Sequence, residues 1–355
     1  IVELPFGQRE GEVAGDGEER VQARHILIAT GSRTARAPIP GLDGPRVVDH
    51  WGALNLEALP ESVCIIGAGA IGLEFASIFC EMGVEVTLVE MLPRIAPLMD
   101  QSVGEGLAWS LERRGVEILI STRVTAIEHG AEGSRVAMAT PEGERAVEVE
   151  VVLSAIGRSP NIEGLGLEVL GLKPTRAGIA VDSRMHTAVP GVYAIGDVAA
   201  EGPMLAHVAS HQGIVAVEDA LGHPARMDYS AVPNCIFTLP EAASVGLTEE
   251  QARGKGVDVA TGVFALANNG KAVAYGDTEG FVKVVADRET DAVLGVHIVG
   301  PHASDLILEG TVAIALESTL DEIERTIHPH PTLGEAIAEA ALAVRGRALH
   351  VPRRS

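Results

Sequence analysis

The sequence has few cysteines and few aromatic residues. Its three cysteines, Cys64, Cys80 and Cys235, lie in apolar surroundings and far apart along the chain. This spacing argues against a disulfide framework or a cysteine-rich metal site, and it favours inert thiols in a cytoplasmic protein. Aromatic residues make up 3% of the chain, so alanine, valine, isoleucine and leucine must build the hydrophobic cores.

Basic residues and long apolar runs are also scarce. There are 27 lysines and arginines against 49 acidic residues, which gives a net charge of −22. This charge repels nucleic-acid phosphates and anionic lipids, so neither nucleic acid nor a membrane is expected as a partner. No apolar run approaches the roughly 18 residues of a membrane-spanning helix. The chain begins without a methionine or a signal-peptide pattern, as it would if it started inside a longer protein.

The chain does contain alternating strand and helix patterns over 355 residues, with 40 glycines. That length predicts about two or three domains. A hairpin turn is predicted at Gly15-Asp16-Gly17, and residues 146–154 are predicted as one strand. Other strands are predicted at 25–32, 63–66, 84–90, 116–120, 124–128, 192–197, 242–245, 281–287 and 292–299, and helices at 71–82, 102–114, 207–220, 304–316 and 333–344. From about Tyr229 on, strands followed by helices indicate an α+β domain.

The clearest motif is Gly67-Ala68-Gly69-Ala70-Ile71-Gly72, which follows a buried strand and opens a helix. In that setting the pattern G-x-G-x-x-G is typical of a dinucleotide-binding turn, with the diphosphate at the helix N-terminus. Glu90 ends the next strand about 20 residues later, where an acid accepts hydrogen bonds from the ribose. A carboxylate there repels a 2′-phosphate, so NAD is predicted rather than NADP. The alternative is a glycine turn without a ligand and a surface glutamate.

Six groups of residues in a fixed order carry a family resemblance. They are Ala29-Thr30-Gly31-Ser32, the glycine motif with Glu74, Ala155-Ile156-Gly157-Arg158 with Pro160-Asn161, Tyr193-Ala194-Ile195-Gly196-Asp197, Glu241-Ala242-Ala243-Ser244-Val245-Gly246, and His328-Pro329-His330-Pro331-Thr332-Leu333-Gly334-Glu335. Over essentially the whole chain the series resembles the flavoprotein disulfide reductases, the class I pyridine nucleotide-disulfide oxidoreductases. The form His-x-His-Pro-Thr is most similar to dihydrolipoamide dehydrogenases.

The resemblance implies an α/β fold in which a Rossmann-like NAD domain is inserted in a partial FAD domain and an α+β dimerisation domain follows. Residues 1–45 and 158–228 would belong to the FAD domain, 46–157 to the NAD domain and 229–355 to the dimerisation domain. NAD would be held by Gly67, Ala68, Gly69, Ala70, Ile71, Gly72, Glu90, Val124 and Gly157. FAD would be contacted by Thr30, Gly31, Gly196, Asp197, Ala206 and His207, and Glu74 would face the flavin near the nicotinamide.

The resemblance assigns catalysis to His330 and Glu335, and the chemistry of these residue types agrees. A dithiol must lose protons before it reacts, because the thiolate is the nucleophile. An imidazole titrates near neutral pH and can take and return such a proton, and a neighbouring carboxylate would orient the ring. The alternative is a loop histidine between two prolines.

The implied function is NAD-dependent oxidation of dihydrolipoamide through a disulfide and FAD. The implied substrate carrier is the lipoyl domain of a 2-oxoacid dehydrogenase complex. The enzyme would be a homodimer in which the His330 loop serves the partner's disulfide. The family's chain opens with a glycine motif for FAD and a Cys-x-x-x-x-Cys pair, which this sequence lacks. The chain is therefore either a fragment of such an enzyme or a naturally shortened relative. Two further functions stay open: an NAD(H)-binding module without disulfide turnover, and a scaffold that dimerises.

Overall fold

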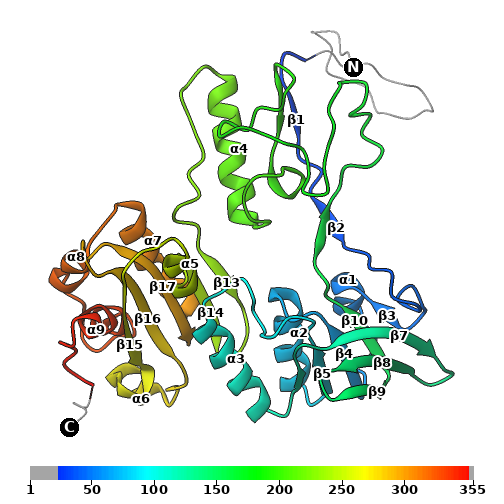
Figure 1. Ribbon diagram of the computed structural model, residues 1–355, viewed down its shortest axis with the longest axis horizontal. Helices are drawn as coiled ribbons and strands as arrows, with labels where there is room; N and C mark the ends of the chain where they lie inside the picture. The colour runs from blue at the N-terminus through cyan, green and yellow to red at the C-terminus, as the bar shows by residue number, and fades with distance from the viewer. Residues whose placement is uncertain (1–22, 352–355) are drawn as a thin grey trace. The chain divides into compact units, whose positions relative to one another are not determined.

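A computed structural model describes residues 23–351 (Figure 1), so the predicted turn at Gly15-Asp16-Gly17 lies outside the described residues. Contacts within the chain divide it into two units. Residues 23–33 and 158–229 belong to the first unit, and residues 34–157 and 230–351 belong to the second. The chain therefore leaves the first unit, forms part of the second, returns, and then completes the second.

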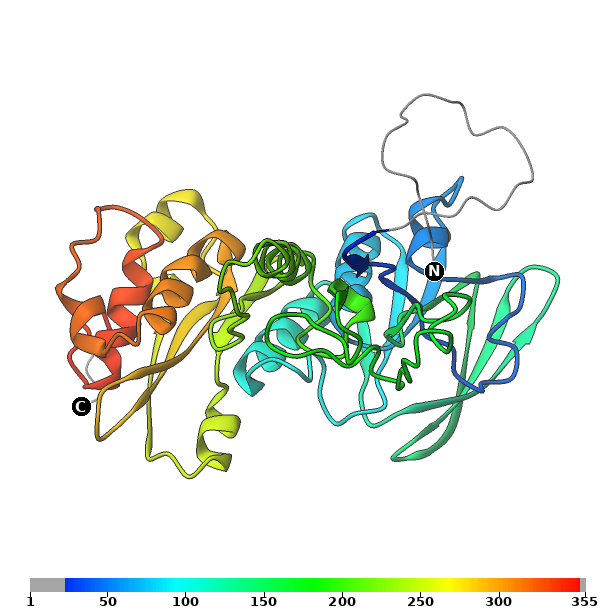
Figure 2. The same cartoon turned by 90° about the horizontal axis from the view of Figure 1, so that it is seen from above.

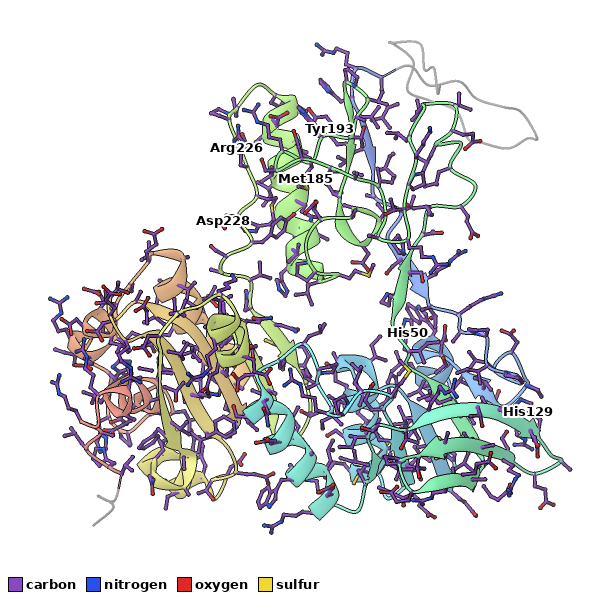
Figure 3. The ribbon with its side chains drawn as sticks, viewed as in Figure 1. His50, His129, Met185, Tyr193, Arg226 and Asp228 are labelled. Atoms are coloured by element: carbon purple, nitrogen blue, oxygen red, sulfur yellow. The ribbon has the colours of Figure 1, made fainter. Side chains whose placement is uncertain are left out.

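Two short two-stranded sheets organise the first unit, and the strands of the first sheet run parallel. Strand β1 (Ile26–Ile28) pairs with β12 (Val192–Ala194), and β2 (Ser32–Thr34) pairs with β11 (Arg158–Pro160). A 3-10 turn, η1 (Gly196–Val198), and helix α4 (Ala206–Ala220) follow β12. Met185 and Tyr193, both labelled in Figure 3, are buried with Val215 and Ala216 of α4. This packing fixes α4 next to the end of β12.

The first half of the second unit is a parallel sheet with helices. Its strands lie in the order β3 (Val47–Val48), β10 (Val151–Ser154), β4 (Ser62–Ile66), β5 (Glu85–Val89) and β6 (Glu117–Leu119). The helices are α1 (His50–Leu54), α2 (Ala70–Glu81) and α3 (Gln101–Arg113). Parallel sheets are covered on both faces, which explains why β4 reads as an unbroken apolar run.

An antiparallel sheet packs against this parallel sheet. It consists of β7 (Arg123–His129), β8 (Ser134–Thr140) and β9 (Gly143–Val149), and Val136 and Met138 pack with Cys64 and Val152. The prediction of one strand over residues 146–154 is wrong, because β9 and β10 belong to different sheets. The chain turns at Glu150, whose N–H donates to Ser62 Oγ and whose carboxylate accepts the N–H of Glu61.

The second half of this unit is an antiparallel sheet in the order β13 (Asn234–Ile236), β14 (Glu241–Gly246), β17 (Val293–Gly300), β16 (Phe281–Asp287) and β15 (Val259–Ala265). Its helices are α5 (Glu249–Gly254), α6 (Gly270–Tyr275), α7 (Ala303–Ala315), α8 (Leu320–Arg325) and α9 (Glu335–Val344), with a 3-10 turn, η2 (Leu266–Asn268). Helix α7, drawn in orange, packs on β14 and β17 (Figure 2). Helix α9, drawn in red, packs on β15 and β16 (Figure 1).

One hydrophobic core joins the two halves of the second unit. Leu107 and Leu111 of α3 are buried in the same cluster as Ile236, Ala242 and Val299 of the antiparallel sheet. The predicted α/β class is confirmed, and strand and helix positions agree with prediction to within a few residues for most elements. The three predicted domain boundaries stay a prediction.

Candidate functional site

The glycine motif forms a bend between β4 and α2, at the carboxyl ends of the parallel strands. Strand β4 has β10 on one side and β5 on the other, so the bend lies between Ala155, which follows β10, and Glu90, which follows β5. The N–H of Gly67 donates to the carbonyl of Val89 at 2.8 Å. In open parallel sheets, ligands bind at this edge.

Each glycine of the bend meets a different physical requirement. Gly67 has φ +104°, and a Cβ there would lie 2.4 Å from the carbonyl oxygen of Ala155. A Cβ at Gly72 would lie 1.9 Å from the carbonyl oxygen of Gly67, so only glycine lets the helix approach the strand this closely. A Cβ at Gly69 would meet no atom within 4 Å. The space beside Gly69 is therefore open to a ligand.

The first turn of α2 offers backbone N–H groups to that space. Gly69 is the N-cap residue and has no side chain to satisfy them. Ala70, Ile71 and Gly72 form the first turn of the 12-residue helix. Free N–H groups and the helix dipole together favour an anion such as a diphosphate at this end.

Glu90 points back at the bend. Its Oε2 accepts the N–H of Ala68 and its Oε1 accepts the N–H of Leu92, both at 2.8 Å, and the residue is 8% exposed. Each carboxylate oxygen has a second acceptor position. Glu90 is thus fixed beside the bend and keeps acceptor capacity for a sugar hydroxyl.

Three further residues predicted to lie near NAD are Gly157, Val124 and Glu74, and their surroundings differ from one another. Gly157 has φ +107°, and no atom lies within 4 Å of the position a Cβ would take. The side chain of Val124 is 5% exposed and packs in the core with Ile66 and Val89. Glu74, on α2, accepts the N–H of Phe237 at 3.0 Å, and burial raises its pKa.

In the first unit, the predicted flavin residues follow two neighbouring parallel strands. Thr30 and Gly31 come after β1, and Gly196 and Asp197 come after β12. Thr30 Oγ1 donates to the carbonyl of Asn161 at 2.8 Å, and the N–H of Asn161 donates to the carbonyl of Gly31 at 2.8 Å. Ala206 and His207 are exposed at the start of α4.

Asp197 is held by two residues whose role the sequence analysis missed. Ser32 Oγ donates to Asp197 Oδ2, and Arg158 Nε lies 3.8 Å from the same oxygen. Arg158 Nε also donates to Ser32 Oγ at 2.7 Å. Both residues stand inside the motifs Ala29-Thr30-Gly31-Ser32 and Ala155-Ile156-Gly157-Arg158, so a signal was present. The carboxylate of Asp197 is thereby oriented at the carboxyl end of β12.

His330 and Glu335 are in contact. Nδ1 of His330 lies 2.9 Å from Glu335 Oε1, and Glu335 Oε2 accepts the N–H of Thr332 at 2.8 Å. Burial raises the pKa of Glu335, but the hydrogen bonds from Thr332 and His330 outweigh it and leave this pKa below its usual value. An ionised Glu335 fixes the proton on Nδ1, which leaves Nε2 as the basic nitrogen. The His330 side chain is 75% exposed, so Nε2 is accessible.

The three cysteines form no disulfide. Cys64 is buried in β4, and this burial, with the nearby charge of Glu117, raises its pKa to about 12. Burial also raises the pKa values of Cys80 and Cys235. None of these thiols is therefore set up as a thiolate nucleophile.

Residues 23–351 contain neither a membrane-spanning helix nor a cluster of metal ligands. None of their helices combines the length and apolar character needed to cross a membrane. Histidine, cysteine, aspartate and glutamate side chains in this range form no group of three or more that could hold a metal ion.

Residues 4–213 match the family described as pyridine nucleotide-disulphide oxidoreductase. Residues 232–341 match the dimerisation domain of the same family. These two matches together cover most of the chain.

Curated relatives and solved structures are similar over most of the chain. Dihydrolipoyl dehydrogenase of Bacillus subtilis is 43% identical over 95% of this chain and 72% of that protein, and the Thermus scotoductus protein of the same name is 43% identical over 98% and 75%. LpdA of Mycobacterium tuberculosis has a TM-score of 0.82 at 34% identity, covering 89% of this chain and 69% of that one. The HOCl-induced flavoprotein disulfide reductase RclA of Escherichia coli has a TM-score of 0.83 at 30% identity, covering 89% and 73%.

Proposed function

The chain belongs to the pyridine nucleotide-disulphide oxidoreductase family, and we propose that it acts in the NAD-dependent oxidation of dihydrolipoamide. This is the reaction for which its dihydrolipoyl dehydrogenase relatives are named. The observation that carries the proposal is the bend at Gly67, Gly69 and Gly72, with Glu90 fixed beside it. The family uses FAD and NAD(H), and the residues of this chain suit parts of both cofactors.

The bend suits the diphosphate of NAD. The open space beside Gly69 lets the diphosphate reach the N–H groups at the start of α2, and no side chain is in the way. Glu90 suits the adenosine ribose, since its carboxylate can accept both hydroxyl hydrogens. The same negative charge disfavours the 2′-phosphate of NADP.

The residues after β1 and β12 suit FAD. Asp197, oriented by Ser32 and Arg158, would accept hydrogen bonds from the flavin's sugar-alcohol chain. Gly31 and Gly196, with φ +69° and +67°, let the backbone turn at the sheet edge where a nucleotide would lie. Bound FAD would supply the two-electron redox chemistry that links the dithiol to NAD.

His330 and Glu335 suit proton transfer. A thiol of dihydrolipoamide gives its proton to Nε2 of His330 and becomes the thiolate that attacks a disulfide. The imidazolium is stabilised by Glu335, which already holds Nδ1–H at 2.9 Å. The proton later returns to the leaving thiolate, so His330 acts in both directions.

The C-terminal half of the second unit suits a homodimer. Leu308, Val312 and Leu316 follow one another at four-residue spacing along α7 and past its end, and they are 61%, 49% and 72% exposed. Such a row is typical of a helix that packs against a partner subunit. In the full-length enzyme, the exposed His330 would then serve a disulfide of the partner subunit, formed by the Cys-x-x-x-x-Cys segment that this sequence lacks. A lipoyl domain would be the substrate carrier, in the cytoplasm.

One observation favours a second function, an NAD(H)-binding module that dimerises without disulfide turnover. The sequence holds three cysteines at positions 64, 80 and 235. None of them pairs with another, and each has a raised pKa. A single sulfur cannot close an intramolecular disulfide.

Three measurements on the purified chain test these functions. NADH titration followed by NADH fluorescence tests the bend, and Glu90→Arg should weaken NADH and relatively favour NADPH. Flavin absorbance tests FAD. NADH-dependent reduction of a lipoamide analogue tests turnover, and His330→Gln should remove turnover while leaving NADH binding intact.

The outcomes separate the functions. If the protein is yellow and reduces the lipoamide analogue, the function as a mere NAD(H)-binding module is excluded. If the chain binds NADH but is colourless and inactive, that second function is favoured. If the chain binds no NADH, the proposal that NAD is held at the glycine bend is contradicted. Unchanged coenzyme preference in Glu90→Arg would show that Glu90 is not at the ribose.

A further inference from the structure

A buried ion-pair cluster lies in the second unit, away from the glycine bend in sequence. Lys283 Nζ on β16 is 2.9 Å from Asp100 Oδ1 and 2.7 Å from Glu249 Oε2. The side chains of Lys283 and Asp100 are 8% and 1% exposed. Asp100 Oδ2 also accepts the N–H of Glu249 at 2.9 Å. The cluster therefore ties the N-cap of α3 to β16 and to the start of α5.

Within the cluster, Lys283 and its carboxylate partners are charged, while the neighbouring His297 is neutral. His297 next to it is neutral, because burial lowers its pKa to about 4. Burial would raise the pKa of Asp100, but hydrogen bonds from Ser102, from the N–H of Glu249 and from Lys283 Nζ hold it below its usual value. Lys283 is thus the cation that balances two buried or half-buried carboxylates. Removing one partner of such a group leaves an uncompensated charge.

Residues 91–100 connect this cluster to the glycine bend. At one end, the N–H of Leu92 donates to Glu90 Oε1, and the N–H of Ala96 donates to the carbonyl of Ala68 at 2.9 Å. At the other end, Asp100 sits in the cluster. In between, Arg94 Nη1 donates to Glu250 Oε1 at 2.7 Å.

The middle of this segment is held rigidly. Ile95, Ala96 and Met99 are 2%, 3% and 1% exposed and belong to the core shared by α3 and the antiparallel sheet. Ala96 has φ +45°, a left-handed conformation that costs a non-glycine residue energy and persists only where the surroundings impose it. The same residue makes the hydrogen bond to Ala68.

We propose that residues 91–100 act as a strap through which the antiparallel sheet positions the NAD-binding bend, and that Arg94 and Lys283 are its positioning residues. The inference rests on the proposed function, because it assumes that NAD binds at the bend. The strap holds the carbonyl of Ala68 through Ala96 and one oxygen of Glu90 through Leu92. Loosening either anchor lets the bend and the ribose acceptor drift from the geometry that NAD requires.

The test is the dissociation constant for NADH, measured by fluorescence well below the unfolding temperature. Arg94→Gln removes the ion pair with Glu250, and Lys283→Met removes the buried cation at similar length. Networks of this kind change binding at a distance by roughly 2- to 30-fold, and both variants should weaken NADH within that range. Arg135→Gln is the matched control, because its ion pair with Glu148 is exposed and touches no strap residue. It should leave NADH affinity unchanged.

A second measurement separates positioning from a merely structural role. In a Glu90→Gln background the strap holds a weaker ribose acceptor, so the loss caused by Arg94→Gln should be smaller than in the wild type. Equal losses in both backgrounds, or lower thermal stability with unchanged NADH affinity, overturn the inference. If Lys283→Met does not fold, Arg94→Gln decides alone, since Arg94 is partly exposed. Wild-type protein that binds no NADH overturns the proposed function and the strap together, whereas normal binding in both variants overturns the strap only.

Discussion

Replacing Gly72 by alanine should disturb both folding and coenzyme binding. The new Cβ would lie 1.9 Å from the carbonyl oxygen of Gly67, and ordinary contact begins at 3.4 Å, so helix α2 must move by roughly 1.5 Å. Because the obstacle is backbone, no side chain can turn aside. Overpacking of this kind costs about 1–3 kcal/mol. The shift also displaces the helix N-terminus from the bend.

Gly69→Ala is the matched variant, because it adds the same methyl group three residues earlier. No atom lies within 4 Å of that methyl, and the backbone at Gly69 is extended, with φ −79°. Loss of the glycine N-cap costs at most about 1 kcal/mol. The methyl group does, however, enter the space proposed for the diphosphate, so NADH should bind about tenfold more weakly or worse.

The two variants therefore have different signatures. Thermal unfolding should show a clear fall in Tm for Gly72→Ala, at about 2–4 °C per kcal/mol, and little change for Gly69→Ala. NADH fluorescence titration should show weaker binding for both. A Gly69→Ala protein that binds NADH as well as the wild type would refute the placement of NAD at the bend. An unchanged Tm in Gly72→Ala would refute the close approach of helix and strand.

Two further predictions concern side chains with shifted pKa values. Iodoacetamide should leave Cys64 unmodified in the folded protein and label it only after unfolding, because burial raises its pKa to about 12; mass spectrometry that finds Cys64 labelled in the native state contradicts this. The bond to Glu309 raises the pKa of His328 above 6.5, so the stability from this pair is full below about pH 6.5 and is lost as pH rises through the raised value. The Tm difference between wild type and Glu309→Gln should shrink as the pH is raised from there, and a difference that is constant with pH speaks against a charged His328.

Much of the fold and the family could be predicted from local sequence signals. The family, the α/β class and the similarity to dihydrolipoyl dehydrogenases, in a family that uses FAD and NAD(H), are confirmed by the matches over nearly the whole chain. The bend was predictable because the glycines, the apolar strand β4 and the start of α2 are contiguous. The separation of β9 from β10 was not, because the apolar pattern of residues 146–154 runs on past the change of sheet at Glu150.

Contacts between distant residues explain most of what the sequence analysis missed. Lys283 and Asp100 are 183 positions apart, and nothing near either residue indicates a buried partner. Strand β8 was missed although residues 134–140 alternate in burial, since only its pairing with β7 and β9 turns that weak pattern into a sheet. The roles of the site residues, including His330 and Glu90, stay predictions that the contacts support.

The two units differ in how much of a cofactor site their own residues complete. In the second unit, the bend is held by three residues of the same unit: Ala155, Glu90, and Ala96 of the strap. In the first unit, the proposed flavin residues follow a two-stranded sheet whose β1 leaves Ile26 and Leu27 37% and 43% exposed. Two-stranded sheets are marginal supports. NADH binding should therefore survive mild destabilisation of this chain longer than any flavin binding, because its site rests on the larger core.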